Sequence, residues 1–400
     1  MALHVLVVGA GVGGLCLAHG LRKSGVDVSV FERDPSADSR RQGYRIHINA
    51  AGHAALEECL PPDQFALYVA TSTKPPLLPR AASYDHQFTL VRSMDEDGPD
   101  VDPKRAPTAV NRLTLRQIML ARLGDAVQFG RTLVHVDQDE DGVVAHFADG
   151  STATGDVLVA ADGINSVVRS QLVPDAAVVD TGLRGITGKA LIHGEPGDSI
   201  PEELYNKFTG VIGPDFHALA LGVYQARREP ARAAADLAPD VALDPVSDYL
   251  MWITIAPREQ FPIPEAELWE ADPSMLHRLA LKLIEGWHPE LRRLLEQADE
   301  ELTFPVSFRT ARSVGAWAPS NVTLLGDAIH AMTPVGGCGA NTALWDAALL
   351  SRLLARANRG ELTTRATIEQ YENAMREHGF AAVEEALVGA QRIGARVPSS

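Results

Sequence analysis

The chain has 400 residues, 46% of them hydrophobic, which is enough for two or three domains with sizeable buried cores. Its net charge of −16 and the lack of a basic cluster exclude nucleic acid as a partner. The three cysteines lack metal-ligand spacing and no apolar run reaches ~18 residues, so we expect no disulfide, no metal, no secretion leader, no membrane span and a cytoplasmic location.

A complete strand, helix, strand unit opens the chain. Residues 4–8 form a β-branched run that predicts a buried parallel strand. The segment 9–14 (GAGVGG) follows, and leucines at helical spacing then predict a helix that ends near Ser24. Residues 26–31 alternate as a second strand that ends at Glu32. This order predicts a Rossmann-like dinucleotide-binding unit.

The glycines of this unit have separate physical tasks. Gly9 permits a tight turn, Gly11 lets the backbone approach a pyrophosphate, and Gly14 lets the helix pack on the strand. The pyrophosphate would lie at the helix N-terminus, where unpaired N–H groups and the dipole favour negative charge. Glu32 is placed to accept hydrogen bonds from a ribose diol, which favours FAD or NAD over NADP.

Two later segments favour FAD over NAD. After Arg33 the chain continues over 40–49 as a loop and a short strand, without the further strand-helix units of a nicotinamide dehydrogenase. Residues 156–169 predict a strand that runs into an Asp-Gly turn and a helix start. Residues 322–330 predict a strand that ends in a Gly-Asp pair, before a glycine-rich turn and an apolar helix over 343–354.

Three motifs, GAGVGG, ADGINSVVR and LLGDAIHAMTPVGGCGAN, carry a family resemblance. In their order and spacing the chain resembles the single-component flavin aromatic hydroxylases, which are the FAD monooxygenases similar to para-hydroxybenzoate hydroxylase. That family includes polyketide hydroxylases and tetracycline-inactivating enzymes. The resemblance runs from Leu3 to about Tyr371, and the third motif departs from the family pattern where Cys338 replaces a glutamine.

The resemblance implies roles for four side chains. Glu32 would bind the adenosine ribose of FAD, and Asp327 the ribityl hydroxyls. Arg112 would lie on the helix beside the flavin phosphate chain, and Asp162 near the pyrophosphate and the reductant. Plainer interpretations remain: a helix N-cap for Asp327, a solvated helix face for Arg112 and an ordinary turn for Asp162.

A glycine-rich turn opens the helix of the third motif. In the family such a segment faces the pyrimidine edge of the flavin, where fixed backbone dipoles would stabilise the negative charge of reduction. Close helix packing would also require glycines. The complete set of expected cofactor-binding residues is Gly9, Gly11, Gly13, Gly14, Glu32, Arg33, Arg112, Asp162, Asp327, Pro334, Gly336, Gly337, Gly339 and Asn341.

The middle of the chain predicts a second sheet. Residues 133–147 predict a hairpin and 151–159 a strand at the edge of the cofactor domain. Residues 227–248 predict an irregular cover, and 276–296 a helical return to the first domain. Strands of a separate sheet are expected over 188–193, 217–224 and 249–255. The expected domains are a FAD-binding domain (1–75, 105–180 and 276–365), a substrate domain (76–104 and 181–275) and a C-terminal helical segment (366–400).

The predicted fold class is α/β: a Rossmann-like FAD-binding domain of the GR2 type, a smaller, mainly β substrate domain and a C-terminal helical tail. The resemblance implies an NAD(P)H-consuming FAD monooxygenase. Hydride would reduce the flavin, O2 would add at C4a, and the hydroperoxide would hydroxylate an aromatic or polycyclic, polyketide-like small molecule. Epoxidation, Baeyer-Villiger oxidation and a non-catalytic flavin carrier or sensor stay open, as does a monomer or a homodimer.

The chain contains no second GxGxxG turn that could bind the reductant. NADPH or NADH is therefore expected to bind transiently, with its phosphates near Arg33, Arg40, Arg41 and Arg45. The candidate residues of the substrate cavity are His47, His217, Tyr224 and Trp252, and none of them is assigned as a general base.

Overall fold

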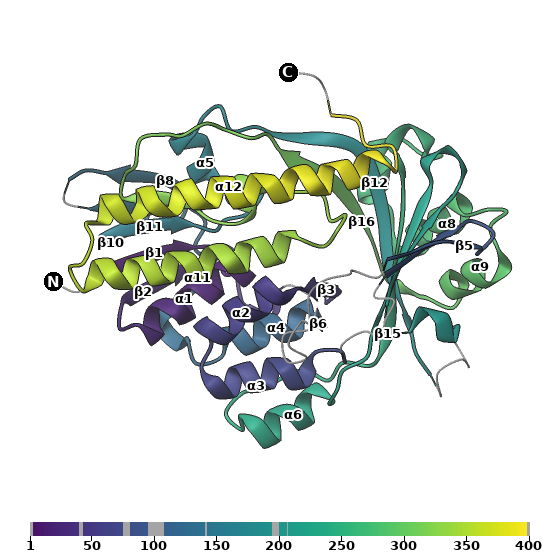
Figure 1. The fold of residues 1–400 in the computed structure, drawn as a ribbon, viewed down its shortest axis with the longest axis horizontal. Coiled ribbons are helices and arrows are strands. Elements are labelled where there is room, and N and C mark those ends of the chain that lie inside the picture. The colour runs from purple at the N-terminus through teal and green to yellow at the C-terminus, as the bar shows by residue number, and fades with distance from the viewer. Residues whose placement is uncertain are drawn as a thin grey trace.

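The computed structural model describes residues 3–39, 43–74, 81–94, 108–140, 142–193, 200–205 and 207–397. Two units lie side by side in Figure 1, each built on its own sheet. A parallel sheet with its helices forms one unit, and a larger, mostly antiparallel sheet seen edge-on forms the other. The mixed α/β fold agrees with the expectation from the sequence.

The parallel sheet is built as the opening motif predicts. Its strand order is β17-β11-β1-β2-β7, with every neighbouring pair parallel. All residues of β11 and β17 are buried, which explains the uninterrupted apolar sequence of β11. The strands are β1 (His4–Val8), β2 (Asp27–Phe31), β7 (Val127–Gln128), β11 (Val157–Ala160) and β17 (Val322–Leu324).

Helices enclose this sheet and share one core with it. The helix α1 (Val12–Lys23) packs on α11 (Gly339–Asn358), and α12 (Thr364–Gln391) runs alongside α11 (Figure 1). We expected only a short helical tail after Tyr371, but α12 continues that core through Phe380 and Val383. The remaining helices are α2 (Ala50–Cys59), α3 (Pro62–Thr71), α4 (Arg112–Leu120), α5 (Val167–Leu172) and α10 (Asp327–His330).

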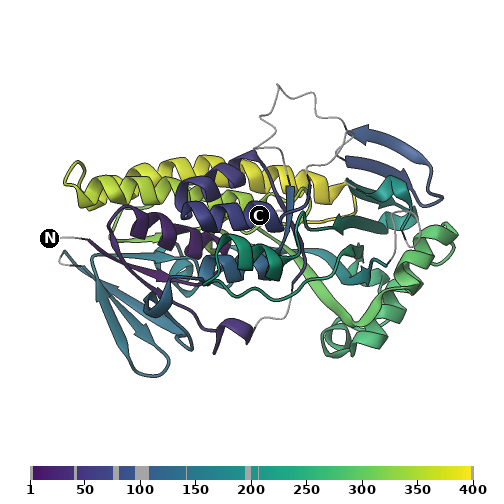
Figure 2. The ribbon, with the colours of Figure 1, turned by 90° about the horizontal axis from the view of Figure 1, so that it is seen from below.

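Two small sheets complete the first unit. The expected hairpin and the strand after it form the antiparallel sheet β10-β9-β8, which projects from the unit on the side away from α12 in Figure 2. A two-stranded ribbon, β3 (Arg45–Ile48) with β6 (Thr108–Asn111), lies between the two units. The strands of the three-stranded sheet are β8 (Leu133–Gln138), β9 (Val143–Phe147) and β10 (Thr152–Gly155).

The second unit is a seven-stranded sheet in the order β16-β12-β15-β14-β13-β4-β5. It contains the three strands expected from the sequence, and only the pair β13 and β4 is parallel. Its strands are β4 (Ala81–Asp85), β5 (Leu90–Met94), β12 (Val178–Leu191), β13 (Phe208–Ile212), β14 (Ala218–Tyr224), β15 (Tyr249–Pro257) and β16 (Asp299–Ala311).

Two expectations about this region are wrong. Residues 276–296 do not return to the first unit: α8 (Pro273–Leu283) and α9 (Pro289–Glu296) pack with the second sheet, and α7 (Glu265–Glu270) joins them. The apolar faces of these helices cover the side of the sheet that carries Trp252. The cover over 227–248 is also not wholly irregular, since α6 (Pro230–Leu237) packs on α3.

Candidate functional site

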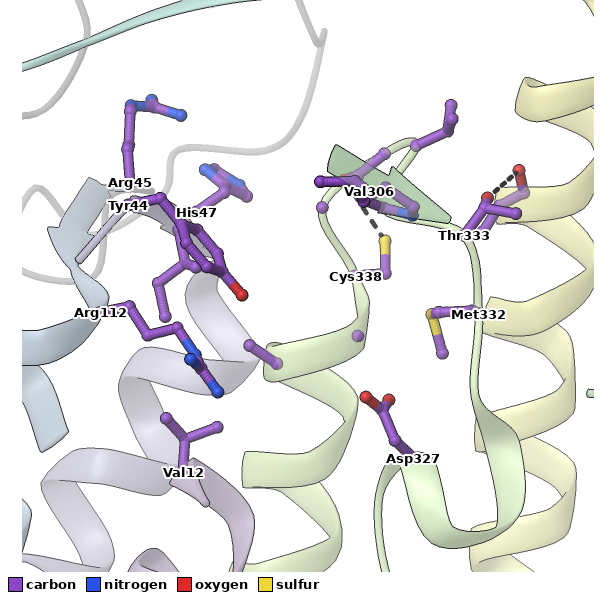
Figure 3. A pocket seen from close by; sticks show the side chains of 18 of the residues that line it. Val12, Tyr44, Arg45, His47, Arg112, Val306, Asp327, Met332, Thr333 and Cys338 are labelled. Carbon is purple, nitrogen blue, oxygen red and sulfur yellow. Dashed lines mark hydrogen bonds between the residues drawn. The ribbon is translucent and has the colours of Figure 1, made fainter. Parts of the chain in front are cut away.

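One cavity of about 2020 Å³ reaches from the glycine turn after β1 to the inner face of the seven-stranded sheet. Its walls come from both units, with β3 between them. Figure 3 shows part of this space, with Arg112, Asp327 and Met332 around it. Every expected cofactor-binding residue except Asn341 lines the cavity.

The glycine turn has the geometry that its sequence predicts. Gly9 has a φ of 109°, and a Cβ there would lie 2.2 Å from the Ala161 carbonyl oxygen. A Cβ on Gly14 would lie 2.1 Å from the Gly9 carbonyl oxygen, so helix α1 could not start this close to β1 with any other residue. A Cβ on Gly11 would meet nothing within 4 Å, and this residue lines the cavity. The backbone at Gly11 is therefore open to a phosphate group.

Glu32 lies at the end of β2 and is only 2% exposed. Its two carboxylate oxygens accept hydrogen bonds from the backbone N–H groups of Ala10, at 2.7 Å, and Asp34, at 3.1 Å. These bonds fix the carboxylate beside the glycine turn. Arg33 also lines the cavity, whereas Arg40 and Arg41 lie outside the described residues.

Arg112 and Asp327 point into the same part of the cavity (Figure 3). Arg112 begins α4 and its guanidinium lies 5.4 Å from the centre of the Tyr44 ring, so it is not a solvated helix-face arginine. Asp327 begins α10, whose N-cap is Gly326 without any side-chain cap, so the N-cap interpretation of Asp327 is wrong. Burial inside the cavity raises the pKa of the Asp327 carboxyl, against the opposing charges of His330 and Arg112.

Asp162 stabilises a turn and also lies at the cavity wall. One carboxylate oxygen accepts from the Val167 N–H at 3.0 Å and so stabilises the start of α5. The other oxygen is buried without a hydrogen-bond partner among the described residues, and the side chain lines the cavity. Burial raises the pKa of this carboxyl. The bond to Val167 accounts for the position of Asp162 at this turn, and the residue forms part of the cavity wall.

The turn before α11 presents backbone to the cavity. Gly336 and Gly337 have φ values of 83° and 67°, and a Cβ on Gly337 would lie 3.3 Å from the Cβ of His47. Asn341 does not line the cavity as expected. Its side-chain amide donates to the carbonyl oxygens of His47 and Gly337, both at 3.0 Å, and its oxygen accepts from the Asn49 N–H at 2.9 Å. Asn341 therefore joins this turn to β3.

A buried pair beside Asp327 was missed in the sequence. His330 Nε2 lies 2.6 Å from Asp346 Oδ2, both side chains are 0% exposed, and the same oxygen accepts from the Gly326 N–H at 3.0 Å. Burial lowers the pKa of His330, but the charge and hydrogen bond of Asp346 raise it further, so the net shift is upward. The pair holds Gly326 at a φ of 66°, the turn that presents Asp327. The one available signal was an aspartate within the otherwise apolar segment 343–350.

Only one of the four expected substrate-cavity residues lines the cavity, and it is His47. Burial, together with the charge of Arg45, lowers the pKa of His47 to about 4, so its ring is neutral at pH 7. Trp252 points the other way, because alternation along β15 turns its neighbours Met251 and Ile253 into the cavity and Trp252 toward α8.

The other two candidates are also elsewhere. The Tyr224 hydroxyl donates to the Thr71 carbonyl oxygen at 2.8 Å, and its ring stacks on Tyr249. His217 precedes β14 and does not line the cavity. The residues that do form the inner face are mainly apolar: Val211, Ala218, Leu219, Ala220, Met251, Ile253, Ile255, Phe304 and Val306.

Comparisons with known proteins agree with this architecture. Residues 7–54 match the family described as NAD(P)-binding Rossmann-like domain, and residues 292–386 match the FAD binding domain family. A structure described as a FAD containing monooxygenase, from Photorhabdus luminescens, is 31% identical, with a TM-score of 0.84 over 98% of both chains. The chain belongs to the FAD-dependent monooxygenases.

Among the relatives of this FAD-dependent monooxygenase is a dual O-methyltransferase/FAD-dependent monooxygenase of Phaeosphaeria nodorum, 35% identical over 88% of this chain and 40% of that protein. The chain spans about half the length, or slightly less, of the curated relatives it matches first. The HpxO structure of Klebsiella pneumoniae, solved with FAD and uric acid, shares the fold at 23% identity, with a TM-score of 0.77 over 96% of this chain and 87% of that one.

The cavity suits the FAD of such a monooxygenase. Open backbone at Gly11, the fixed carboxylate of Glu32 and the Arg112 guanidinium supply donors and acceptors that a dinucleotide needs. Within the described ranges, no helix is long and apolar enough to cross a membrane. The same residues contain no group of three His, Cys, Asp or Glu side chains arranged to hold a metal.

Proposed function

We propose that the protein uses NAD(P)H and O2 to hydroxylate an aromatic or polycyclic small molecule. The observation that carries this proposal is the single cavity that joins the nucleotide-binding turn to an apolar sheet face. Its volume is about 2020 Å³. An ordinary ligand pocket has a volume of about 300–1,000 Å³, so this cavity is at least about twice as large. The cavity therefore has room for a dinucleotide and a ring substrate together.

FAD, when bound, would supply hydride acceptance from the nicotinamide and transfer of one oxygen atom from O2. The chain's own residues would hold and orient the groups. Glu32 and Asp327 would accept from the sugar and ribityl hydroxyls, and Arg112 would donate to phosphate oxygens. Backbone N–H groups near Gly337 would stabilise negative charge at the pyrimidine edge without reorganisation.

The apolar inner face would exclude water and fix the substrate ring. Met251 and Ile253 from β15 and Phe304 from β16 form a flat, largely uncharged wall for a planar molecule. The fused relatives give chemical support, because an O-methyltransferase requires an acceptor hydroxyl and hydroxylation of a ring produces one.

Turnover with labelled oxygen tests the proposal. FAD-loaded protein would be mixed with NADPH or NADH and a panel of hydroxylated naphthoates and anthraquinones, and oxidation of the reductant, O2 uptake and product mass would be recorded. We expect at least one ring compound to accelerate oxidation of the reductant and to gain one ¹⁸O atom from ¹⁸O2. Ligand-independent oxidation that yields only hydrogen peroxide would contradict hydroxylation, and no oxidation at all would indicate a carrier or sensor.

A further inference from the structure

The phosphates of NADPH or NADH were the expected partners of Arg45. In the structure this side chain lies against the seven-stranded sheet. Arg45 begins β3, and its Nε donates to the Val223 carbonyl oxygen on β14 at 3.1 Å. A Cβ on Gly222 would lie 3.1–3.3 Å from the Cδ, Nη1 and Cζ atoms of Arg45. The missing side chain at Gly222 therefore leaves a slot in which the guanidinium lies flat on the sheet.

Among the described residues, this guanidinium has no counter-charge. Within the part of the chain that the structure describes, no carboxylate forms an ion pair with Arg45, and its one hydrogen bond is to a neutral carbonyl. Burial lowers the pKa of Arg45 to about 10, so the side chain is still charged at pH 7. A cation that lines a cavity and has no charged partner there is stabilised when an anion binds beside it.

The direction of Arg45 separates it from the cofactor residues. In Figure 3, Arg112 extends toward Asp327, whereas Arg45 extends from β3 in the opposite direction. Arg45 and Arg112 both line the cavity. Beside Arg45 the cavity is also lined by Val223 and by Met251, which pairs with Gly222 across the neighbouring strand. A planar cation beside these apolar side chains suits a planar apolar ring that carries an anionic group.

We propose that Arg45 determines substrate specificity by binding a carboxylate, so that the protein acts on aromatic acids. The inference rests on the proposed function for what happens to the bound acid, but the binding step is independent of it. The two outer nitrogens of the guanidinium would donate to the two carboxylate oxygens, and Val223 would keep the fork in place through Nε.

Two anthraquinones that differ in one substituent test this binding step: rhein, which carries a carboxylate, and aloe-emodin, which carries a hydroxymethyl group there. Their dissociation constants would be measured by equilibrium dialysis with FAD-loaded protein and no reductant. The Arg45→Met variant removes the charge at similar length, and Arg45→Lys keeps the charge without the planar fork. Arg392→Met is the matched control, because Arg392 lines the same cavity but is exposed.

We expect the unsubstituted protein to bind rhein at least about tenfold more tightly than aloe-emodin, as a charge-assisted hydrogen-bond pair implies. In Arg45→Met this ratio should fall to near one, with the affinity for aloe-emodin retained. Arg45→Lys should give an intermediate ratio, and Arg392→Met the original one.

Three results would overturn the assignment: no preference for rhein in the unsubstituted protein, binding of neither quinone, or a preference that survives Arg45→Met. Loss of FAD absorbance or of NADP⁺ binding in Arg45→Met with an unchanged ratio would assign Arg45 to a cofactor instead. The assay involves no turnover, so a protein that prefers rhein but oxidises no NAD(P)H would disprove only the proposed function.

Discussion

Substitution of Asp327 can distinguish an effect on FAD binding from an effect on folding stability. Asp327 makes no hydrogen bond among the described residues and caps no helix, although it lines the cavity. We expect Asp327→Ala to lower FAD occupancy while the melting temperature of the FAD-free protein stays the same. Asp272→Ala is the control, since Asp272 caps α8 through a 2.7 Å bond from the Met275 N–H. That control should lose about 1 kcal/mol of stability and keep its FAD.

The flavin-to-protein absorbance ratio and the melting temperature measure the two effects for both variants. Normal FAD occupancy in Asp327→Ala would contradict the ribityl role of this residue.

Glu32 couples the shape of the glycine turn to ribose binding. Glu32→Gln keeps the size of the side chain, but its NH2 group would face a backbone N–H that now donates to the carboxylate. Charged hydrogen bonds of this kind contribute about 1.5–3 kcal/mol, so we expect FAD affinity to fall about tenfold or more. Titration of FAD-free protein with FAD measures this, and Asp27→Asn, at the exposed start of the same strand, should leave it unchanged. Equal affinities in the two variants would remove Glu32 from the binding site.

At the scale of elements, the turn before α11 should act through its backbone. Gly337 has a φ of 67° and lies against His47, so Gly337→Ala introduces both strain and a contact at 3.3 Å. We expect reduced FAD affinity and, in the fraction that keeps FAD, a lower flavin midpoint potential, because displaced N–H dipoles stabilise the reduced anion less. Gly25→Ala imposes similar strain, at a φ of 74°, outside the cavity. If both variants changed the potential equally, the turn would have no special relation to the flavin.

Helix α12 carries a buried acid that should make stability depend on pH. Glu372 is 3% exposed, and burial raises its pKa to about 7, against the opposing hydrogen bond that Thr323 donates. The folded protein holds this proton more tightly than the unfolded chain, whose carboxyl has the ordinary value of 4.5. The resulting stability is present below about pH 4.5 and is lost as the pH rises to about 7.

Glu372→Gln should therefore stabilise the protein at pH 8, by at most about 3 kcal/mol, and change little at pH 5. Melting temperatures at both pH values measure the effect, and Glu369→Gln on the exposed side of α12 is the control. A gain that is equal at both pH values would show that ionisation of Glu372 is not its cause.

What could be predicted from the sequence depends on how local the determinants are. The opening strand, turn and helix are specified within thirty residues, and Gly9 and Gly14 are close-packed as their spacing required. The amphipathic pattern of α8 does not say which sheet its apolar face will cover, so its place beside Trp252 was missed. Arg45 resembled other arginines after Glu32, and only the packing of β3 on β14 distinguishes it.

The whole molecule depends on contacts that cross between the two sheets. A small core of Leu183, Phe308, Ala390 and Ile393 joins the second sheet to the end of α12, while the middle of α12 belongs to the first core. The cavity lies between these anchored units, so its two walls are held at a fixed separation without direct pairing of the sheets. A ligand that contacts both walls should therefore stabilise the whole protein.

Binding of FAD should accordingly appear as a concentration-dependent rise in the melting temperature. A ligand that binds only the folded state adds about 2.7 kcal/mol at one hundred times its dissociation constant. We expect calorimetry of FAD-free protein to show the transition moving upward with added FAD, and both units to unfold at higher temperature, because the cavity walls come from both. Asp327→Ala should need more FAD for the same rise. A second transition whose temperature is independent of FAD would show instead that the seven-stranded sheet unfolds without sensing the cofactor.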